Sequence, residues 1–249
     1  TASGLNRYDG YDTRIYRSLK DDGNSLPDSY IEDIQEDATG NLWVRTGAGY
    51  AIYNSVSDIF DRNVEGWMWH IGISGNPSTV YIDSEKIFWI YVAGKGIYCY
   101  KPGQENAVMV AGTDTLLTEM NITDMTECSE GILLAFGNGV LACLDREKLN
   151  VKWTFDGIAS QWGKNQSETF TLFVDSHERV WMYSVEGMWV YHLPKKSWEV
   201  RSVRSDRSNM VRAISQDKYG NIWIGRDQDG IEVIGLDGES VRLMNDLIM

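Results

Sequence analysis

Short stretches of alternating apolar and polar residues recur along the chain, each followed by a turn of small and polar residues. Residues 30–34 alternate in this way, and the period of two indicates a β-strand with one buried face. A second apolar stretch follows the turn at 42–44, and a glycine about six residues later opens a third at 49–53. A looser fourth stretch closes a unit, as at 197–201. The pattern predicts repeated units of four short antiparallel strands.

The turn between the first two strands of each unit is an internal repeat. Asp37 to Trp43 reads Asp-Ala-Thr-Gly-Asn-Leu-Trp, and Asp217 to Trp223 reads Asp-Lys-Tyr-Gly-Asn-Ile-Trp. Weaker copies run from Asp83 to Trp89 and from Asp175 to Trp181, and a degenerate copy without tryptophan runs from Glu127 to Leu133. The last residues of the five copies are 46, 44, 48 and 42 positions apart. This period is the length of one four-stranded blade of a β-propeller.

Each residue type in the repeat has a structural reason. Asp can cap the backbone of its own turn, Gly supplies a positive φ, and Trp can pack between neighbouring sheets. We therefore expect the signature residues to hold the fold and not to bind a ligand. They are Asp37, Gly40, Trp43, Asp83, Trp89, Asp175, Trp181, Asp217, Gly220 and Trp223.

The sequence predicts an all-β fold, a β-propeller of four-stranded antiparallel blades that occupies residues 1–249. Five whole blades follow half a blade, because the repeat begins at Gly4 in the phase of a third strand. The expected boundaries are 1–20 for the half blade and 28–72, 78–112, 120–156, 168–204 and 209–245 for the whole blades. Unpaired strand edges favour a piece of a larger ring or a domain that borrows strands. A six-bladed ring completed by a homodimer partner stays open.

Three segments carry a resemblance to a known family. Gly4–Gly10, Asn24–Asp28 and Asp37–Trp43 resemble successive pieces of the two-component regulator propeller repeat. The resemblance covers nearly the whole chain and is sharpest in the first and last repeats. It implies a seven-bladed ring in the periplasmic sensor region of a hybrid two-component regulator from glycan-degrading Gram-negative bacteria. The membrane helix and the intracellular histidine kinase of such a receptor would lie outside this chain.

The resemblance also implies a function and partners. Family members detect oligosaccharides and switch on genes for glycan use, so the expected ligand is an oligosaccharide or another small molecule. The expected protein partners are a second copy of the chain, in a homodimer, and the rest of the receptor. No cofactor is expected.

Charge and hydropathy narrow the set of partners. The 249 residues carry a net charge of −13, which disfavours nucleic acid. The same field disfavours a sulfated or uronate-rich ligand more weakly, because a local basic pocket could overcome it. No apolar run approaches the ~20 residues of a membrane helix.

Cys99, Cys128 and Cys143 lack metal-ligand spacing, and Cys99 and Cys143 are expected to be buried in strands.

Departures from the family pattern at strand ends suggest ligand contacts. Two positions after the tryptophan the family favours Gly, as at Gly225, and four other blades have Arg45, Tyr91, Ala135 and Tyr183 in this position. Arginine and tyrosine near a blade rim could stack on sugar rings and donate hydrogen bonds. Arg226, directly after Gly225, is a further candidate. The alternative is that these side chains fill space left by the glycine.

Exposed aromatic residues form the second group of candidates. Trp67 and Trp69 are expected in an outer strand or an inter-blade loop, where two residues of this spacing share one face. They could bind a sugar, or they could pack at a sheet edge or a dimer contact. Trp162 lies in the polar and glycine-containing stretch 156–168, which lengthens one repeat and is expected on one face of the propeller.

Signals for catalysis are weak. His70, His177 and His192 have no metal-ligand spacing, and His177 and His192 are explained as solvated polar residues. Neither a serine nucleophile motif nor a phosphate-binding loop is present, so no catalytic or metal-binding residue is expected. The chain has 36 acidic residues, however, and a carboxylate pair could still meet in space. A propeller-fold polysaccharide lyase or glycoside hydrolase therefore remains the alternative function.

Overall fold

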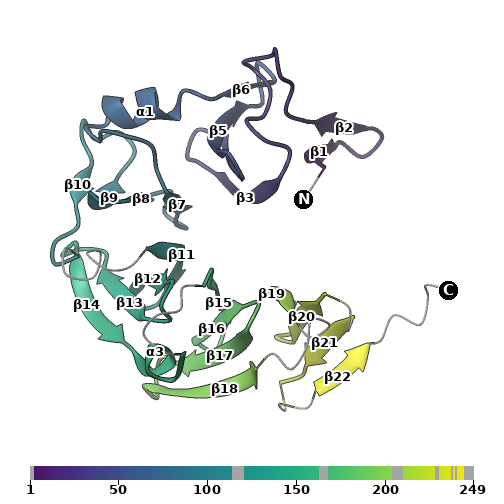
Figure 1. The fold of residues 1–249 in the computed structure, drawn as a ribbon, viewed down its shortest axis with the longest axis vertical. Coiled ribbons are helices and arrows are strands. Elements are labelled where there is room, and N and C mark those ends of the chain that lie inside the picture. The colour runs from purple at the N-terminus through teal and green to yellow at the C-terminus, as the bar shows by residue number, and fades with distance from the viewer. Residues whose placement is uncertain are drawn as a thin grey trace. The chain divides into compact units, whose positions relative to one another are not determined.

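The computed structural model describes residues 3–113, 121–162, 168–203, 210–227, 230–236, 238 and 240–243, without the side chains at 161–162, 202–203 and 242–243. Residues 1–113 and 114–249 form two compact units. Both units are built from small antiparallel sheets, and the described residues add two short helices, α1 (Val64–His70) and α3 (Gly157–Trp162). Figure 1 shows the strands of each sheet as neighbouring arrows.

The first unit contains one two-stranded and two four-stranded sheets. The two-stranded sheet pairs β1 (Leu5–Tyr8) with β2 (Thr13–Tyr16). The next sheet contains β3 (Ile31–Glu36), β4 (Leu42–Thr46), β5 (Gly49–Asn54) and β6 (Ile59–Asp61). After α1, the last sheet contains β7 (Thr79–Ile82), β8 (Phe88–Val92), β9 (Gly96–Tyr100) and β10 (Val108–Met109).

The second unit contains three four-stranded sheets. The first has β11 (Ile122–Cys128), β12 (Gly131–Phe136), β13 (Leu141–Asp145) and β14 (Asn150–Phe155). The second has β15 (Thr171–Val174), β16 (Arg179–Ser184), β17 (Gly187–His192) and β18 (Ser197–Val203). The third has β19 (Val211–Gln216), β20 (Ile222–Arg226), β21 (Ile231–Ile234) and β22 (Ser240–Leu243).

In every sheet the hydrogen-bonded order follows the order along the chain, and every pair is antiparallel. This is the strand arrangement of propeller blades. The predicted fold is confirmed: an all-β propeller chain with five four-stranded blades and, before them, a two-stranded half blade.

The apolar cores lie between consecutive sheets. Trp43 of β4 is 2% exposed, and its ring packs edge-on against Phe88 of the next sheet at a centroid distance of 5.3 Å. Trp181 of β16 belongs to a buried cluster that includes Val211 and Ile214 of the following sheet. The prediction that these tryptophans pack between neighbouring blades is confirmed at both positions. Cys99 and Cys143 are buried in strands, as expected.

Polar side chains also join one sheet to the next. The Gln35 amide of β3 donates to the carbonyl of Val80 at 2.9 Å and accepts from the Ile82 amide at 2.6 Å. In the second unit, a carboxylate oxygen of Asp124 accepts from the Leu172 amide at 2.7 Å. Each of these bonds fixes the register of the first strand of one blade against that of the next.

One local expectation is wrong, and the degenerate copy differs in its turn from the other four. Trp67 and Trp69 do not lie in an outer strand or a loop, because residues 64–70 form α1, which begins after Asn63. Glu127 does not cap a turn as the aspartates do; its carboxylate pairs with Arg146 at 2.6 Å. The turn after β11 is tighter, since Cys128 pairs directly with Gly131, and it has no place for the longer aspartate loop.

Neither described helix, with seven residues in α1 and six in α3, reaches the length or the apolar character needed to cross a bilayer.

Candidate functional site

In each aspartate-to-tryptophan turn, both oxygens of the aspartate carboxylate accept hydrogen bonds. In all four copies, one oxygen accepts from the tryptophan indole N–H six residues later, with N–O distances of 3.2, 3.0, 2.8 and 3.0 Å along the chain. The other oxygen accepts backbone amides two and four residues after the aspartate, as from His177 at 2.9 Å and Arg179 at 3.1 Å in the third copy. The tryptophan therefore donates a hydrogen bond to the turn in addition to the packing role that the sequence predicts for it.

The last copy illustrates the electrostatic consequence. Hydrogen bonds from the side chain of Asn221, and then from the indole of Trp223, hold the pKa of Asp217 at about 2, below its ordinary value of 3.8. These donors stabilise the charged carboxylate. In this last copy the turn is therefore built around an aspartate that stays ionised.

Because the aspartate needs only the backbone amides of the second and fourth following residues, the side chains at those two positions can differ between copies. The second position has Thr39, Glu85, His177 and Tyr219 in the four copies. The fourth position has Asn41, Ile87, Arg179 and Asn221. Only the third copy has a histidine and an arginine at these positions.

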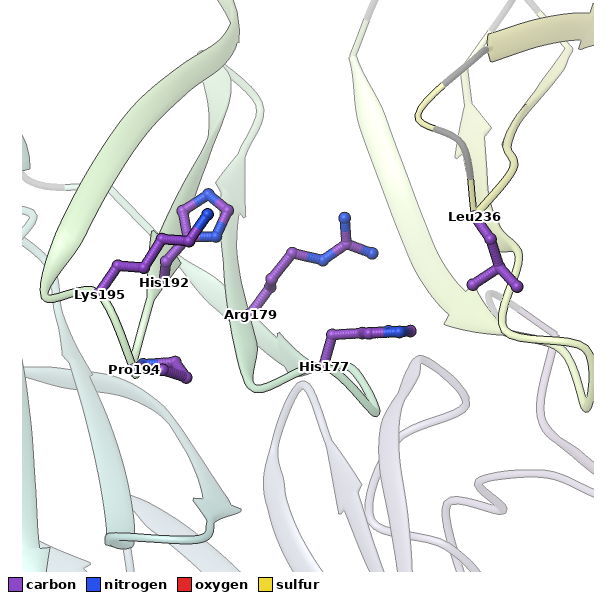
Figure 2. A pocket seen from close by; sticks show the side chains of 6 residues that line it. All are labelled: His177, Arg179, His192, Pro194, Lys195 and Leu236. Atoms are coloured by element: carbon purple, nitrogen blue, oxygen red, sulfur yellow. The ribbon is translucent and has the colours of Figure 1, made fainter.

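A pocket of about 310 Å³ opens beside this third copy, between the β15–β18 and β19–β22 sheets. The turn that joins β15 to β16, the start of β16, the turn that joins β17 to β18 and the loop after β21 form its walls. Its lining residues are His177, Arg179, His192, Pro194, Lys195 and Leu236. In Figure 2, Arg179 and His177 extend from one hairpin toward the loop that carries Leu236.

The polar lining of this pocket is basic. The Arg179 Nε donates to the buried Asp175 carboxylate at 2.5 Å, and the guanidinium lies 5.3 Å from the centre of the Trp181 ring. Lys195 is exposed and has no ion-pair partner in the part of the chain that the structure describes. The neighbouring Lys196 turns away from the pocket to Glu130 of the preceding sheet, at 2.5 Å. The pocket therefore offers nitrogen donors and a positive charge.

Three acidic groups of the described residues lie near the pocket. All four contacts that the Asp175 carboxylate accepts come from its own turn, namely two backbone amides, the Trp181 indole and Arg179. Glu178 accepts from the Ser129 hydroxyl of the preceding sheet at 2.7 Å. An oxygen of the Glu199 carboxylate lies 4.0 Å from the His192 Nε2, and the Glu199 side chain is half exposed. No carboxylate of the described residues belongs to the lining.

A second pocket, of about 440 Å³, lies in the first unit between β1 and β3. It is lined by Gly4, Leu5, Asn6, Ile31, Glu32, Asp33 and Ile34. Here one of the sequence candidates is close by: the Arg45 Nε donates to Glu32 at 2.8 Å. The ion pair occupies the guanidinium with a carboxylate of the same sheet, and the lining itself is acidic.

The other candidates at strand ends are buried. Tyr91 is 2% exposed and Tyr183 is 8% exposed, and burial raises the pKa of the Tyr183 hydroxyl to about 12. The Arg226 side chain is 3% exposed and pairs with Glu232 at 2.7 Å. The structure thus favours the space-filling interpretation for the two tyrosines and an internal ion pair for Arg226. None of the three lines either pocket.

The tryptophan candidates differ in their exposure to solvent. Trp67 packs into the core, with ring-centroid distances of 4.6 Å to Trp43 and 5.2 Å to Phe88, whereas Trp69 is 75% exposed. A helix turns neighbours two apart onto different faces, so they do not share a surface. Trp162 is the last residue of α3, and its side chain lies outside the described residues.

The basic pocket was not predicted from the sequence. The sequence explains His177 and His192 as solvated polar residues, and Arg179 and Lys195 are not among its candidates. The available signal was the comparison of the four turns, in which Arg179 replaces the asparagine of the first and last copies. In the described residues, no group of three or more His, Cys, Asp or Glu side chains could hold a metal ion.

Comparisons with known proteins agree with the repeat. The two component regulator propeller model matches residues 25–48 and 205–225, in the first and last whole repeats. No curated protein matches the chain in sequence.

Solved structures share the fold at low sequence identity. The extracellular domain of BT3049 from B. thetaiotaomicron, assigned to a hybrid two-component system, is 16% identical over 98% of this chain and 32% of its own, with a TM-score of 0.68. The extracellular domain of BT4673 from B. thetaiotaomicron, assigned to a one-component system, is 19% identical over 97% of this chain and 34% of its own, with a TM-score of 0.68.

An enzyme shares the fold as well. A catalytically inactive virginiamycin B lyase from Staphylococcus aureus is 12% identical over 94% of this chain and 74% of its own, with a TM-score of 0.60. The chain spans about a third of the length of the two extracellular domains. These likenesses establish the propeller fold.

Proposed function

We propose that this chain, which belongs to the two-component regulator propeller family, is part of the ligand-binding region of a signalling receptor and lies outside the cytoplasm. The observation that carries the proposal is the combination of the family repeat in the first and last blades with a fold shared with extracellular domains of signalling systems. In a Gram-negative cell this region would face the periplasm.

The distribution of chemistry within a blade supports binding at the turns. The second strand of each four-stranded blade buries most of its side chains, as in β8 and β12, where every residue is buried. Turns on a rigid β scaffold are where binding residues can vary without loss of the core. The pocket that contains Arg179 is formed by turns of two sheets, so a ligand there would contact both blades.

The proposed ligand is an oligosaccharide, and the proposed partners are the rest of the receptor chain and a second copy of this protein. A ligand that touches two blades binds one relative arrangement of them better than another. Such differential affinity is what a ligand needs in order to shift a conformational equilibrium. Signal transmission by this region would then require binding but no chemical change of the ligand.

The experiment combines binding and turnover on the same samples. Thermal-shift measurements and calorimetry against a panel of neutral and acidic oligosaccharides should identify a ligand that raises the melting temperature. Chromatography of the same mixtures after long incubation should return the oligosaccharide intact. Product formation that is lost when Glu32 and Asp33 of the acidic pocket are changed to Gln and Asn would overturn the proposal in favour of a lyase or hydrolase.

A further inference from the structure

We infer that the pocket between the β15–β18 and β19–β22 sheets binds an oxyanion group carried by a sugar-sized ligand. The group is a carboxylate or a sulfate ester, as on an acidic saccharide. The inference rests on the proposed function and names the class of ligand. It concerns the residues that line this pocket, above all Arg179 and Lys195.

The four turns of the chain serve as internal references for this site. In all four turns the aspartate accepts the same hydrogen bond from the tryptophan indole. The second and fourth residues after the aspartate contribute their backbone amides to the turn, so the fold does not require particular side chains there. The first and last turns have asparagine at the fourth position, and Asn221 donates its amide to Asp217 at 2.9 Å. Arg179 makes the equivalent bond through Nε. It therefore keeps the turn intact and adds two terminal nitrogens beyond it.

The terminal nitrogens of Arg179 point outward from a fixed base. Asp175, with a fully buried side chain, holds Nε, and the Trp181 ring lies 5.3 Å from the guanidinium carbon. In the described part of the chain, no acceptor is bonded to Nη1 or Nη2. A guanidinium held at one edge presents its remaining N–H groups in the planar geometry that matches two oxygens of a carboxylate or sulfate. Little side-chain entropy is left to lose on binding.

The other polar lining residues add donors for the same ligand. Lys195 supplies an ammonium group, and His177 and His192 each supply at least one N–H in either protonation state. Pro194 and Leu236 supply the apolar surface on which a sugar ring can rest. A volume of about 310 Å³ lies at the lower end of the range for small-molecule sites.

The surrounding charge makes this pocket selective. The whole chain has a net charge of −13, so an anion is repelled from most of its surface. Here, by contrast, the polar lining among the described residues is basic, and the carboxylates of Asp175 and Glu178 are engaged in bonds to the protein. A neutral sugar could use the donors and the apolar surface but would gain no attraction between opposite charges.

The test compares acidic and neutral sugars on the intact 249-residue protein. Calorimetry and ligand-observed NMR are run with glucuronate, glucose 6-sulfate and glucose. We expect at least one acidic sugar to bind, and the two to compete if both bind. Glucose should bind at least about tenfold more weakly, because it lacks the charge for one charge-assisted hydrogen bond. Which acidic sugar binds more tightly distinguishes the carboxylate from the sulfate ester.

The variants are chosen so that folding is preserved. Arg179→Asn introduces the residue present at Asn221, whose side-chain amide donates to its turn aspartate, so the turn keeps a bond to Asp175. Lys195→Gln changes an exposed turn residue. Each should weaken binding of the acidic sugar about tenfold. Lys148→Gln is the matched control, because it removes the same charge from the corresponding turn of the preceding blade, where the lysine side chain is 74% exposed.

Several results would overturn the inference. They are glucose binding as tightly as the acidic sugars, no binding of either acidic sugar, or an unchanged affinity in both Arg179→Asn and Lys195→Gln. Neutral oligosaccharides that bind while the acidic sugars do not would overturn this inference and leave the proposed sensing function intact. Intact circular dichroism and melting temperature of the variants separate a lost contact from a lost fold.

Discussion

Replacing Trp181 by phenylalanine tests the bond between the indole and the turn aspartate. Phenylalanine keeps an aromatic ring in the buried position but removes the N–H that Asp175 accepts at 2.8 Å. Because the Asp175 side chain is fully buried, water cannot replace the lost donor. Leaving a charged acceptor without one partner costs about 1.5–3 kcal/mol, and the smaller ring costs about 1 kcal/mol through imperfect packing. We expect a total loss of about 2.5–4 kcal/mol.

The same change at Trp223 provides the comparison. Trp223 and Asp217 are half-buried, so water can reach the carboxylate when the indole is removed. The expected loss for Trp223→Phe is about 1 kcal/mol. Trp69→Phe, at a side chain that is 75% exposed on α1, is the control and should change stability by less than about 0.5 kcal/mol.

Urea denaturation followed by far-ultraviolet circular dichroism measures all three variants against the parent protein. The order of loss should be Trp181→Phe, then Trp223→Phe, then Trp69→Phe. Equal losses for Trp181→Phe and Trp223→Phe, or a loss below about 1 kcal/mol for Trp181→Phe, would refute the reasoning that a desolvated carboxylate depends on the indole.

Three further outcomes follow from described contacts. The pKa of Asp217 is lowered to about 2 in the folded protein. Its stabilising contribution is therefore complete above the unfolded pKa of about 4 and is lost as the pH falls through about 2. Asp217→Asn should flatten the acidic side of a plot of melting temperature against pH. Gly131→Ala should lower stability by more than about 2 kcal/mol in urea titrations, because φ is +147° and a Cβ would collide with the Leu144 carbonyl. Trp67→Ala should cost at least about 3 kcal/mol in the same assay, and a value near that of an exposed residue would contradict its packing in the core.

The blade architecture could be predicted because its signals are local. An aspartate, a glycine and a tryptophan within seven residues fix a turn and the strand after it, and the period between copies gives the length of a blade. The degenerate copy was harder to interpret, because Glu127 matches the aspartate only in charge. The tighter turn from Cys128 to Gly131 leaves no loop for an acid to cap.

Helix α1 was not predicted because its sequence imitates a strand. Trp67 and Trp69 alternate with other residues, and tryptophan is common in strands. The helical signal was Asn63, whose side chain accepts from the Gly66 amide at 3.1 Å and caps the first turn. One cap and seven residues are a weak signal, and packing of Trp67 against Phe88 outweighs local preference.

The basic pocket could not be found from strand patterns, because its residues come from turns of two different sheets. His177 and His192 are separated by two strands, and Leu236 belongs to the next blade. Sequence order says little about which turns face each other. For Tyr91 and Tyr183 the sequence left ligand contact and space filling open, and their burial favours space filling.

The chain-order pairing of every sheet has a consequence for how the protein assembles. Each strand finds its partner a few residues away, and the indole bonds span only six residues. Contacts of such short separation need little loop closure, so a blade can form as soon as its own residues are available. During synthesis the blades would therefore be completed one after another from the N-terminal side. A lesion in one blade would be confined to that blade and the neighbours against which it packs.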